Sequence, residues 1–202
     1  MTRKLALSLL LLSLAVTAGA QSNVEARVKQ IRQAYANRFN LMQNQPYDDP
    51  DMKMYQMTLS YKRMYPGTGY YNHNDVYYWT DDANESYMLK PTLYFVTSNY
   101  SMNSNLYRFS NEFLYDDQTE EPMFILVTTE LMGTGKRSEY RFYFDKGKLI
   151  KQVPERIAPL GDDELVPFFA IDDKGRASEK DLLNELERHR KLFHNSVETL
   201  TW

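Results

Sequence analysis

The 202-residue sequence contains no cysteine. This absence excludes disulfide bonds, catalysis by a thiol nucleophile and metal centres built on thiolate ligands. Histidine is scarce as well, with 3 residues in the chain. Neither the Gly-x-Ser-x-Gly motif of α/β-hydrolases nor the His-Glu-x-x-His motif of zinc proteases occurs. The sequence therefore contains no recognised catalytic or metal-binding motif, and we expect no metal and no other cofactor.

Long hydrophobic runs are missing everywhere except near the N-terminus. Arg3 and Lys4 precede an apolar run over residues 5–16, and Ala18-Gly19-Ala20 supplies the small residues that a signal peptidase accepts. The run is too short for a membrane span, which takes roughly 20 residues. We therefore predict a cleavable export signal that ends before Gln21, with no membrane span in the remaining chain. Because exported eukaryotic domains commonly contain disulfides, an exported chain without cysteine favours a bacterial protein that is periplasmic or secreted.

The sequence also lacks an excess of positive charge. Its formal net charge is −3, and loss of the export signal, which holds two basic residues and no acidic one, would leave −5 over 182 residues. Such a surface offers no electrostatic attraction to nucleic acid or to anionic lipid. We therefore expect no nucleic-acid partner.

What the sequence does contain is a change in hydrophobic periodicity. Apolar residues recur at three- and four-residue steps from about Asn23 to Gln43 and again after Ser178, which predicts a helix at each end. Between these helices the period is two in a series of segments up to Val153, which predicts about six or seven strands. The links between the strands are too short for parallel crossovers. The predicted fold is α+β, with an N-terminal helix, an antiparallel meander sheet and a C-terminal helix packed on the sheet, in a single domain over residues 21–202.

Some boundaries within the strand region follow from turn-forming residues. Residues 70–75 come after a Pro-Gly-rich break and combine Asn, His and Asp, which predicts a loop before a strand over residues 76–80. The next strand is expected over residues 87–100. Residues 154–176 are rich in proline and aspartate and should be irregular, with a short strand near 168–171.

The acidic residues include five Asp-Asp pairs, which could serve acid–base chemistry or hold calcium. The pairs begin at Asp48, Asp81, Asp116, Asp162 and Asp172. Each pair falls where a turn is predicted, so the carboxylates are expected to stabilise turns and to face water. A different position is predicted for His189, which lies on the apolar stripe of the C-terminal helix one turn after Glu185. There it should be a hydrogen-bonded residue at the boundary of the core.

Tyrosine is the most unusual component, because fifteen of the 16 tyrosines lie between Tyr47 and Tyr143. Many of these rings should pair across strands. Alternation can bury only one of two adjacent rings on a sheet covered on one face, so some of them should be exposed. Exposed Tyr and Trp beside Asn, His and Asp are typical of surfaces that contact sugar rings or protein partners. The candidate ligand-binding residues are Tyr70, Tyr71, His73, Asp75, Tyr77 and Trp79.

Two functions are consistent with this sequence. The first is a non-catalytic exported binding protein that contacts a glycan, an apolar small molecule or a protein partner through the aromatic-rich segment. The second is an exported hydrolase in which carboxylates from separate loops act together with His73. Carboxylates that converge in one cleft would favour the hydrolase, and carboxylates that point separately into water would favour the binding protein.

Overall fold

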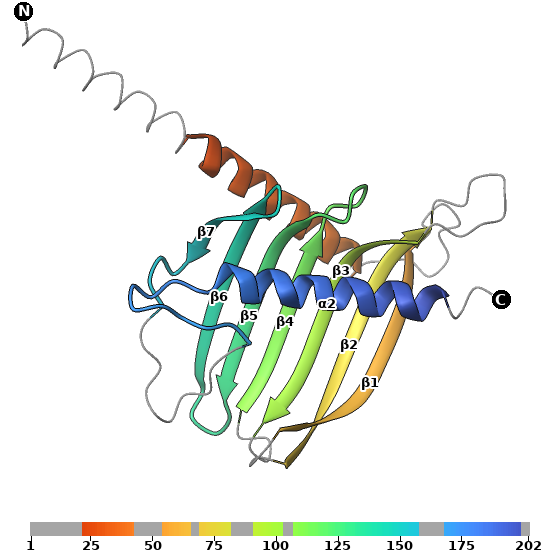
Figure 1. Ribbon diagram of the computed structural model, residues 1–202, viewed down its shortest axis with the longest axis vertical. Helices are drawn as coiled ribbons and strands as arrows, with labels where there is room; N and C mark the ends of the chain where they lie inside the picture. Colours follow the sequence, from red (N-terminus) through yellow and green to blue (C-terminus); the bar gives the residue numbers. More distant parts are fainter. Residues whose placement is uncertain are drawn as a thin grey trace, which may run out of the picture.

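The computed structural model describes residues 22–42, 54–65, 69–81, 91–102, 107–157 and 168–198 (Figure 1). It confirms the predicted α+β fold, with an N-terminal helix, a 7-stranded antiparallel sheet and a C-terminal helix. The two helices pack on opposite faces of the sheet, so the molecule has three layers (Figure 1).

The strands of the sheet follow one another in chain order, which makes the sheet a simple meander. They are β1 (Met54–Tyr65), β2 (Gly69–Asp81), β3 (Pro91–Met102), β4 (Tyr107–Tyr115), β5 (Pro122–Leu131), β6 (Lys136–Asp145) and β7 (Lys148–Val153). Each neighbouring pair is antiparallel, as predicted. The turn between β6 and β7 has a φ of 50° at Lys146 and 71° at Gly147. Two successive positive φ values are what a two-residue hairpin turn requires.

The prediction of a loop over residues 70–75 is wrong, because these residues belong to β2. They pair with β1 along their whole length, from Tyr70 opposite Met64 to Asp75 opposite Leu59. Asn and Asp are depleted in strands, and this composition suggested a loop. Continuous pairing with β1 outweighs that weak local preference, and β2 is longer than predicted.

Two further segments differ in detail from the prediction. β3 begins at Pro91, and the expected start of this strand at residue 87 lies outside the described residues. The short strand expected near residues 168–171 is reduced to a single bridge between Ile171 and Ala177.

The N-terminal helix spans residues 22–42 and buries Val28 and Ile31 against one face of the sheet. α2 (Glu179–Glu198) covers the opposite face. Its buried residues are Leu182, Leu186, His189, Phe193 and Val197, which is the predicted stripe as far as the described residues extend. The helix begins after Ser178, whose Oγ accepts a hydrogen bond from the Asp181 N–H at 3.3 Å, as an N-cap residue should. Because both faces are covered, the central strands can be apolar on both sides.

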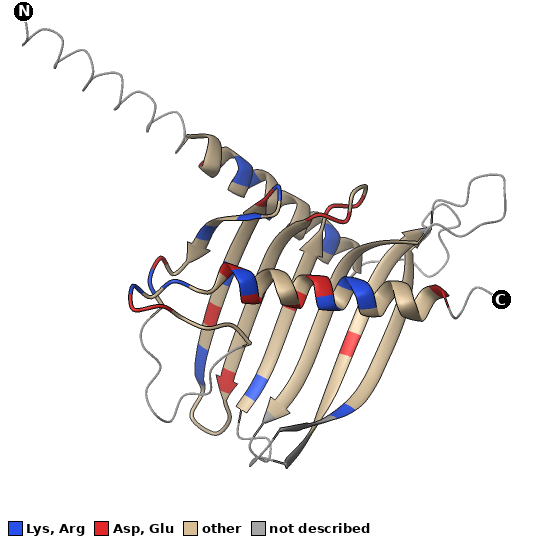
Figure 2. Cartoon of the chain, viewed as in Figure 1, with Lys and Arg blue, Asp and Glu red and all other residues tan. Residues whose placement is uncertain are grey.

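The Asp-Asp pairs beginning at Asp116 and Asp172 lie in turns, as predicted. Asp116 Oδ1 accepts a hydrogen bond from the Gln118 N–H at 3.1 Å, and Asp172 Oδ1 accepts one from the Lys174 N–H at 2.9 Å. The other three pairs fall wholly or partly outside the described residues. Figure 2 shows that charged residues are dense on α2 and the turns and sparser along the strands. Among the described residues Asp75 is the one Asp, Glu, Lys or Arg side chain that is fully buried, and it therefore needs an explanation.

Candidate functional site

A row of polar side chains crosses the α2 face of the sheet. The register places Asp75 of β2 opposite Ser98 of β3, and Ser98 opposite Asn111 of β4. All three residues are buried, with exposed fractions of 0%, 2% and 1%. Adjacent strands are about 4.8 Å apart, so the backbones at Asp75 and Asn111 are about 10 Å apart, with the small serine between them. We call these three residues the polar row.

The polar row lies between an apolar row and an aromatic row of the same face. Toward α2, the next residues of the same strands are Tyr77, Val96 and Phe113, all fully buried in the core beneath the helix. Away from α2, the next residues form a continuous stack of rings, the aromatic ladder. The ladder consists of Tyr61, His73, Tyr100 and Phe109, from β1 to β4. A ligand at the polar row would therefore be enclosed by hydrophobic side chains on two sides.

The rings of the aromatic ladder are packed face to face. The centroids of Tyr61 and His73 are 5.1 Å apart, those of His73 and Tyr100 are 4.5 Å apart, and those of Tyr100 and Phe109 are 4.7 Å apart. Both faces of His73 and of Tyr100 are thus covered by neighbouring rings. Stacking of a sugar needs a free ring face, so these two inner rings can present only their edges to a ligand.

α2 brings a charged network over this part of the sheet. The guanidinium of Arg188 donates to both oxygens of Glu185, at 2.6 and 2.9 Å. A third nitrogen lies 3.5 Å from the hydroxyl of Tyr61, which in turn donates to Asp75 Oδ2 at 2.9 Å. Burial and the neighbouring Asp75 carboxylate raise the pKa of Tyr61 to about 12, so the hydroxyl keeps its proton as a donor. Burial disfavours the charged form of Glu185, but its hydrogen bonds and the adjacent guanidinium outweigh burial and lower its pKa to about 2.

His189 lies next to this network and is fully buried, as the sequence predicts for a residue at the core boundary. Its Nδ1 is 3.2 Å from the Tyr77 hydroxyl, and its Nε2 is 2.9 Å from an Arg188 nitrogen. The same Nε2 is 3.5 Å from Glu185 Oε1, so the ring links the charged pair of α2 to Tyr77 of the sheet.

Two oxygens of the polar row are left without a hydrogen-bond partner. Asp75 Oδ1 and Asn111 Oδ1 are buried atoms for which the described residues supply no donor. Within the described part of the chain no salt bridge reaches Asp75, and the charge of Arg188 is matched by Glu185 at 2.6 Å. A buried carboxylate with one hydrogen bond and no counter-ion is costly to a fold. In folded proteins such atoms are satisfied by a bound water, an ion or a ligand that supplies the missing donor.

The structure changes what the sequence-predicted site residues can do. The side chains of Tyr71, His73, Asp75 and Tyr77 are buried, not exposed as expected, and lie on the α2 face of the sheet at alternate positions of β2. Trp79 is half-buried on the same face and stacks on Tyr55 at 4.5 Å. The side chain of Tyr70, the sixth predicted residue, lies outside the described part of the chain. A ligand can therefore meet these residues only inside the layer between the sheet and α2.

The remaining members of the site are residues that the sequence did not single out. Ser98 and Asn111 are ordinary residues in a strand, and neither belongs to a motif. The signal available was their inward position: each is a polar residue where the two-residue period of its strand calls for an apolar one. Recognising them together requires the cross-strand register, which three separate stretches of sequence do not provide.

The arrangement gives no support to the alternative of a hydrolase. His73 is sandwiched between two rings and does not lie on a loop. The carboxylates of Asp116 and Asp172 are held in their own turns and do not converge with it. Among the residues that the structure describes, no group of three His, Asp or Glu side chains could hold a metal ion.

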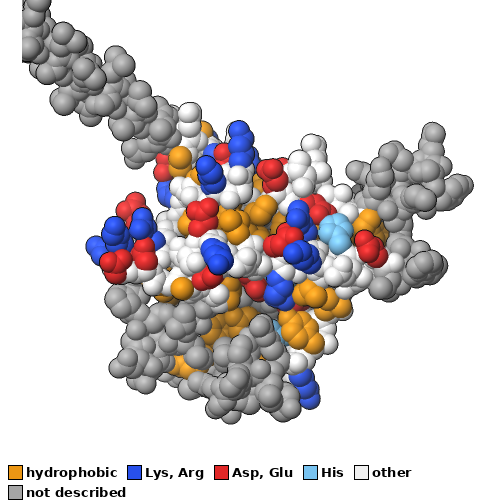
Figure 3. Space-filling model, in the orientation of Figure 1, with side chains coloured by type: hydrophobic (Ala, Val, Ile, Leu, Met, Phe, Trp, Pro, Cys, Tyr) orange, Lys and Arg blue, Asp and Glu red, His pale blue; other side chains and the backbone are white. Residues whose placement is uncertain are grey.

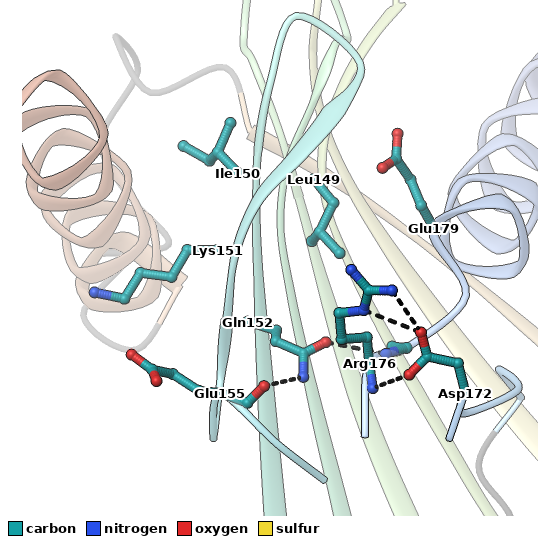
Figure 4. Close-up of a pocket in the computed structure, with 9 residues that line it drawn as sticks. Leu149, Ile150, Lys151, Gln152, Glu155, Asp172, Arg176 and Glu179 are labelled. Atoms are coloured by element: carbon teal, nitrogen blue, oxygen red, sulfur yellow. Dashed lines mark hydrogen bonds and ion pairs between the residues drawn. The ribbon is translucent and has the colours of Figure 1, made fainter. Parts of the chain in front are cut away.

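A separate open cleft of about 550 Å³ lies beside β7 (Figure 4). Several of its polar side chains are already engaged with the protein. Gln152 donates to the carbonyl oxygens of Glu155 and Gly175 at 2.8 and 2.9 Å and accepts from the Ala177 N–H at 3.0 Å. Arg176 is paired with Asp172 at 2.9 Å. These contacts fasten the segment before α2 to the edge of the sheet, so we assign the cleft a structural role.

Comparisons with known proteins provide no template for the polar row. The chain matches no family model, no curated protein and no solved structure. The helices among the described residues are also too short or too polar to cross a membrane. The two oxygens of the polar row that receive no hydrogen bond from the described residues are therefore the best indication of a function.

Proposed function

We propose that this chain is an exported, non-catalytic binding protein that holds a small molecule by a protonated amine at the polar row. The observation that carries the proposal is a pair of buried oxygens, Asp75 Oδ1 and Asn111 Oδ1, to which no described residue donates. An ammonium group supplies three N–H donors and one positive charge. Placed above Ser98, it is within reach of acceptors on both sides and neutralises the Asp75 carboxylate.

The side chains on either side of the polar row favour an amine that carries a hydrocarbon group. The buried core row beneath α2 lies on one side of the polar row, and the ring edges of the aromatic ladder lie on the other. The positive rims of aromatic rings and aliphatic side chains accept a hydrocarbon group but offer little to a polyhydroxylated sugar. Of the ligand classes consistent with the sequence, the apolar small molecule therefore fits best, with the amine as its polar anchor.

Because the polar row is closed to solvent, a ligand reaches it only when the covering side chains move apart. Association is then slower than for an open site. The closed layer also strengthens the interaction once formed, since charge pairs and hydrogen bonds are stronger away from water.

Calorimetric titration with amine and alcohol pairs of equal shape tests the proposal. Tyramine and tyrosol, and butylamine and butanol, differ in whether the polar end is charged. We expect the amine of at least one pair to bind about tenfold to a hundredfold more tightly than its alcohol. A hydrogen bond to a buried charge contributes a free energy of that order. Equal affinity within every pair, or no binding by any amine, would overturn the proposal.

Two substitutions on β3 give a matched control for that titration. Ser98→Leu fills the centre of the polar row and should abolish amine binding. Asn99→Leu alters the next residue, which is exposed on the opposite face, and should leave it unchanged. Loss of binding in both variants would indicate general damage to the strand and would count against the polar row as the site.

The proposal of export rests on the N-terminal sequence alone. We expect the protein recovered from its own host to begin at Gln21, because the small residues before it suit a signal peptidase. Intact-mass measurement of that protein checks this directly. Recovery of the full-length chain from the cytoplasmic fraction would contradict export.

A further inference from the structure

The two edges of the sheet differ in how they are protected against pairing with another strand. β7 has 6 residues and carries Lys148 and Lys151, and short, lysine-bearing edges discourage pairing. β1 is 12 residues long, its basic residues Lys62 and Arg63 both follow Tyr61, and in the described part of the chain no strand lies on its outer side. Figure 3 shows apolar side chains gathered beside α2 on the side of the molecule where β1 lies. The β1 edge therefore offers both unpaired backbone and apolar side chains.

The side chains of β1 form a pattern that reads nearly the same in both directions from Thr58. On the α2 face the order is aromatic, aliphatic, aliphatic, aromatic. These residues are Tyr55, Met57, Leu59 and Tyr61. On the other face the exposed residues Gln56 and Ser60 flank Thr58 at equal distance. Such a palindrome is what an antiparallel pairing of two identical strands requires, because each residue then meets the partner's residue at the mirrored position.

We infer that β1 pairs antiparallel with β1 of a second copy of this chain, across a two-fold axis at Thr58. In this register Tyr55 lies opposite the partner's Tyr61, and Met57 lies opposite the partner's Leu59. Thr58 meets its own copy, which is a favourable cross-strand pair, and Gln56 faces the partner's Ser60. No like charges oppose each other along this stretch. The two sheets of 7 strands become one continuous sheet of fourteen.

Two observations support a second copy over an unrelated strand. The outermost rings of the β1 edge are already stacked on one side, Tyr55 on Trp79 at 4.5 Å and Tyr61 on His73 at 5.1 Å. The pairing would give each of these tyrosines an aromatic neighbour on its other side as well. In addition, α2 extends past β1 in Figure 1, so each helix would reach over the partner's β1. This inference does not rest on the proposed amine site.

Cysteine crosslinking tests the register, since the chain has no cysteine of its own. We expect Thr58→Cys to form an interchain disulfide on mild oxidation, because the two introduced thiols face each other across the axis. Ser60→Cys on the same exposed face should not crosslink, since two copies of residue 60 would be four residues out of register, or about 13 Å apart. Equal crosslinking of the two variants, or none of Thr58→Cys, would overturn the inference.

Charge substitutions test the same pairing without oxidation. Gln56→Lys with Ser60→Lys places like charges opposite each other twice per dimer, whereas Gln56→Lys with Ser60→Glu places opposite charges there. Sedimentation of the chain beginning at Gln21 should show a dimer. The first double variant should raise the dissociation constant of this dimer at least tenfold, and the second should restore it. A monomer at every concentration, or equal behaviour of the two variants, would rule out the self-paired edge and leave a strand of another protein as the occupant.

Discussion

Replacing Asp75 by asparagine is expected to raise the free energy of unfolding of the ligand-free protein by about 1–3 kcal/mol, although most substitutions of buried residues lower it. The reason is that the wild-type carboxylate is fully buried and its Oδ1 has no donor among the described residues. Asparagine keeps an oxygen that can accept from the Tyr61 hydroxyl but removes the buried charge. Urea unfolding of both proteins measures the difference, which corresponds to a rise in Tm of several degrees for a domain of this size.

Asp116→Asn provides the matched control, because the same chemical change should have the opposite sign there. Asp116 Oδ1 accepts hydrogen bonds from two backbone N–H groups of its turn, at 3.0 and 3.1 Å. The folded protein therefore favours the charged form of Asp116. Loss of this charge should destabilise the protein by about 1 kcal/mol. Destabilisation by both substitutions would show that the Asp75 carboxylate is already satisfied within the fold, and would contradict a site that awaits a donor.

Glu185→Gln is expected to lower the free energy of unfolding by about 3 kcal/mol at neutral pH. Arg188 would lose its charged partner while it remains largely buried between α2 and the sheet. The effect should depend on pH because the pKa of Glu185 falls from its usual 4.5 to about 2 in the folded protein. A lowered pKa means that the folded state binds its proton less readily than the unfolded state. The stabilisation by Glu185 is therefore fully present above about pH 4.5 and is lost as the pH falls toward 2.

Urea unfolding of wild type and Glu185→Gln at several pH values tests this expectation. The two proteins should differ most above pH 4.5 and should converge toward pH 2, where Glu185 becomes protonated. Glu187→Gln serves as the control on the same helix, since Glu187 is more exposed and pairs with Arg190 on the surface at 2.7 Å. Surface pairs contribute about 0–1 kcal/mol, so its effect should be small at every pH. A constant difference for Glu185→Gln at all pH values would contradict the role assigned to its charge.

The order of elements could be predicted from the sequence because it depends on local patterns. The change from a helical period to a period of two marked the strand region, and Ser178 marked the start of α2. β2 was predicted too short, since the residues from Asn72 to Asp75 resemble a turn in isolation. Their strand conformation comes from pairing with β1, which begins more than ten positions earlier in the chain. Tertiary pairing of this kind is not encoded in a short window of sequence.

The candidate site could be predicted only in part. Asp75 was among the proposed ligand-binding residues, but its partners Ser98 and Asn111 lie on two other strands. Their alignment depends on the register of β2, β3 and β4, and a slip of one residue would turn each side chain to the opposite face. A bulge between Tyr78 and Trp79 makes this register still harder to deduce from the sequence. The charged network of α2 above the row likewise follows from the packing of the helix and not from its own sequence.

The burial of the predicted aromatic surface also has a simple physical cause. The prediction of exposed rings applies to a sheet covered on one face, on which one of two adjacent rings must be exposed. The two helices cover both faces, so Tyr77 and Tyr78 can point in opposite directions and each meet a helix layer. Among the described aromatic side chains, Tyr55 at the β1 edge is the most exposed, with 43% of its surface accessible, and Phe39 of the N-terminal helix follows with 38%.

A crystal structure of the chain with tyramine tests the central claim most directly, namely that the polar row binds a donor from outside the protein. We expect the ammonium nitrogen above Ser98, within hydrogen-bond distance of Asp75 Oδ1 and Asn111 Oδ1. A structure in which ordered water alone fills these positions in saturating amine, or in which the two oxygens bond to the chain itself, would contradict the assignment.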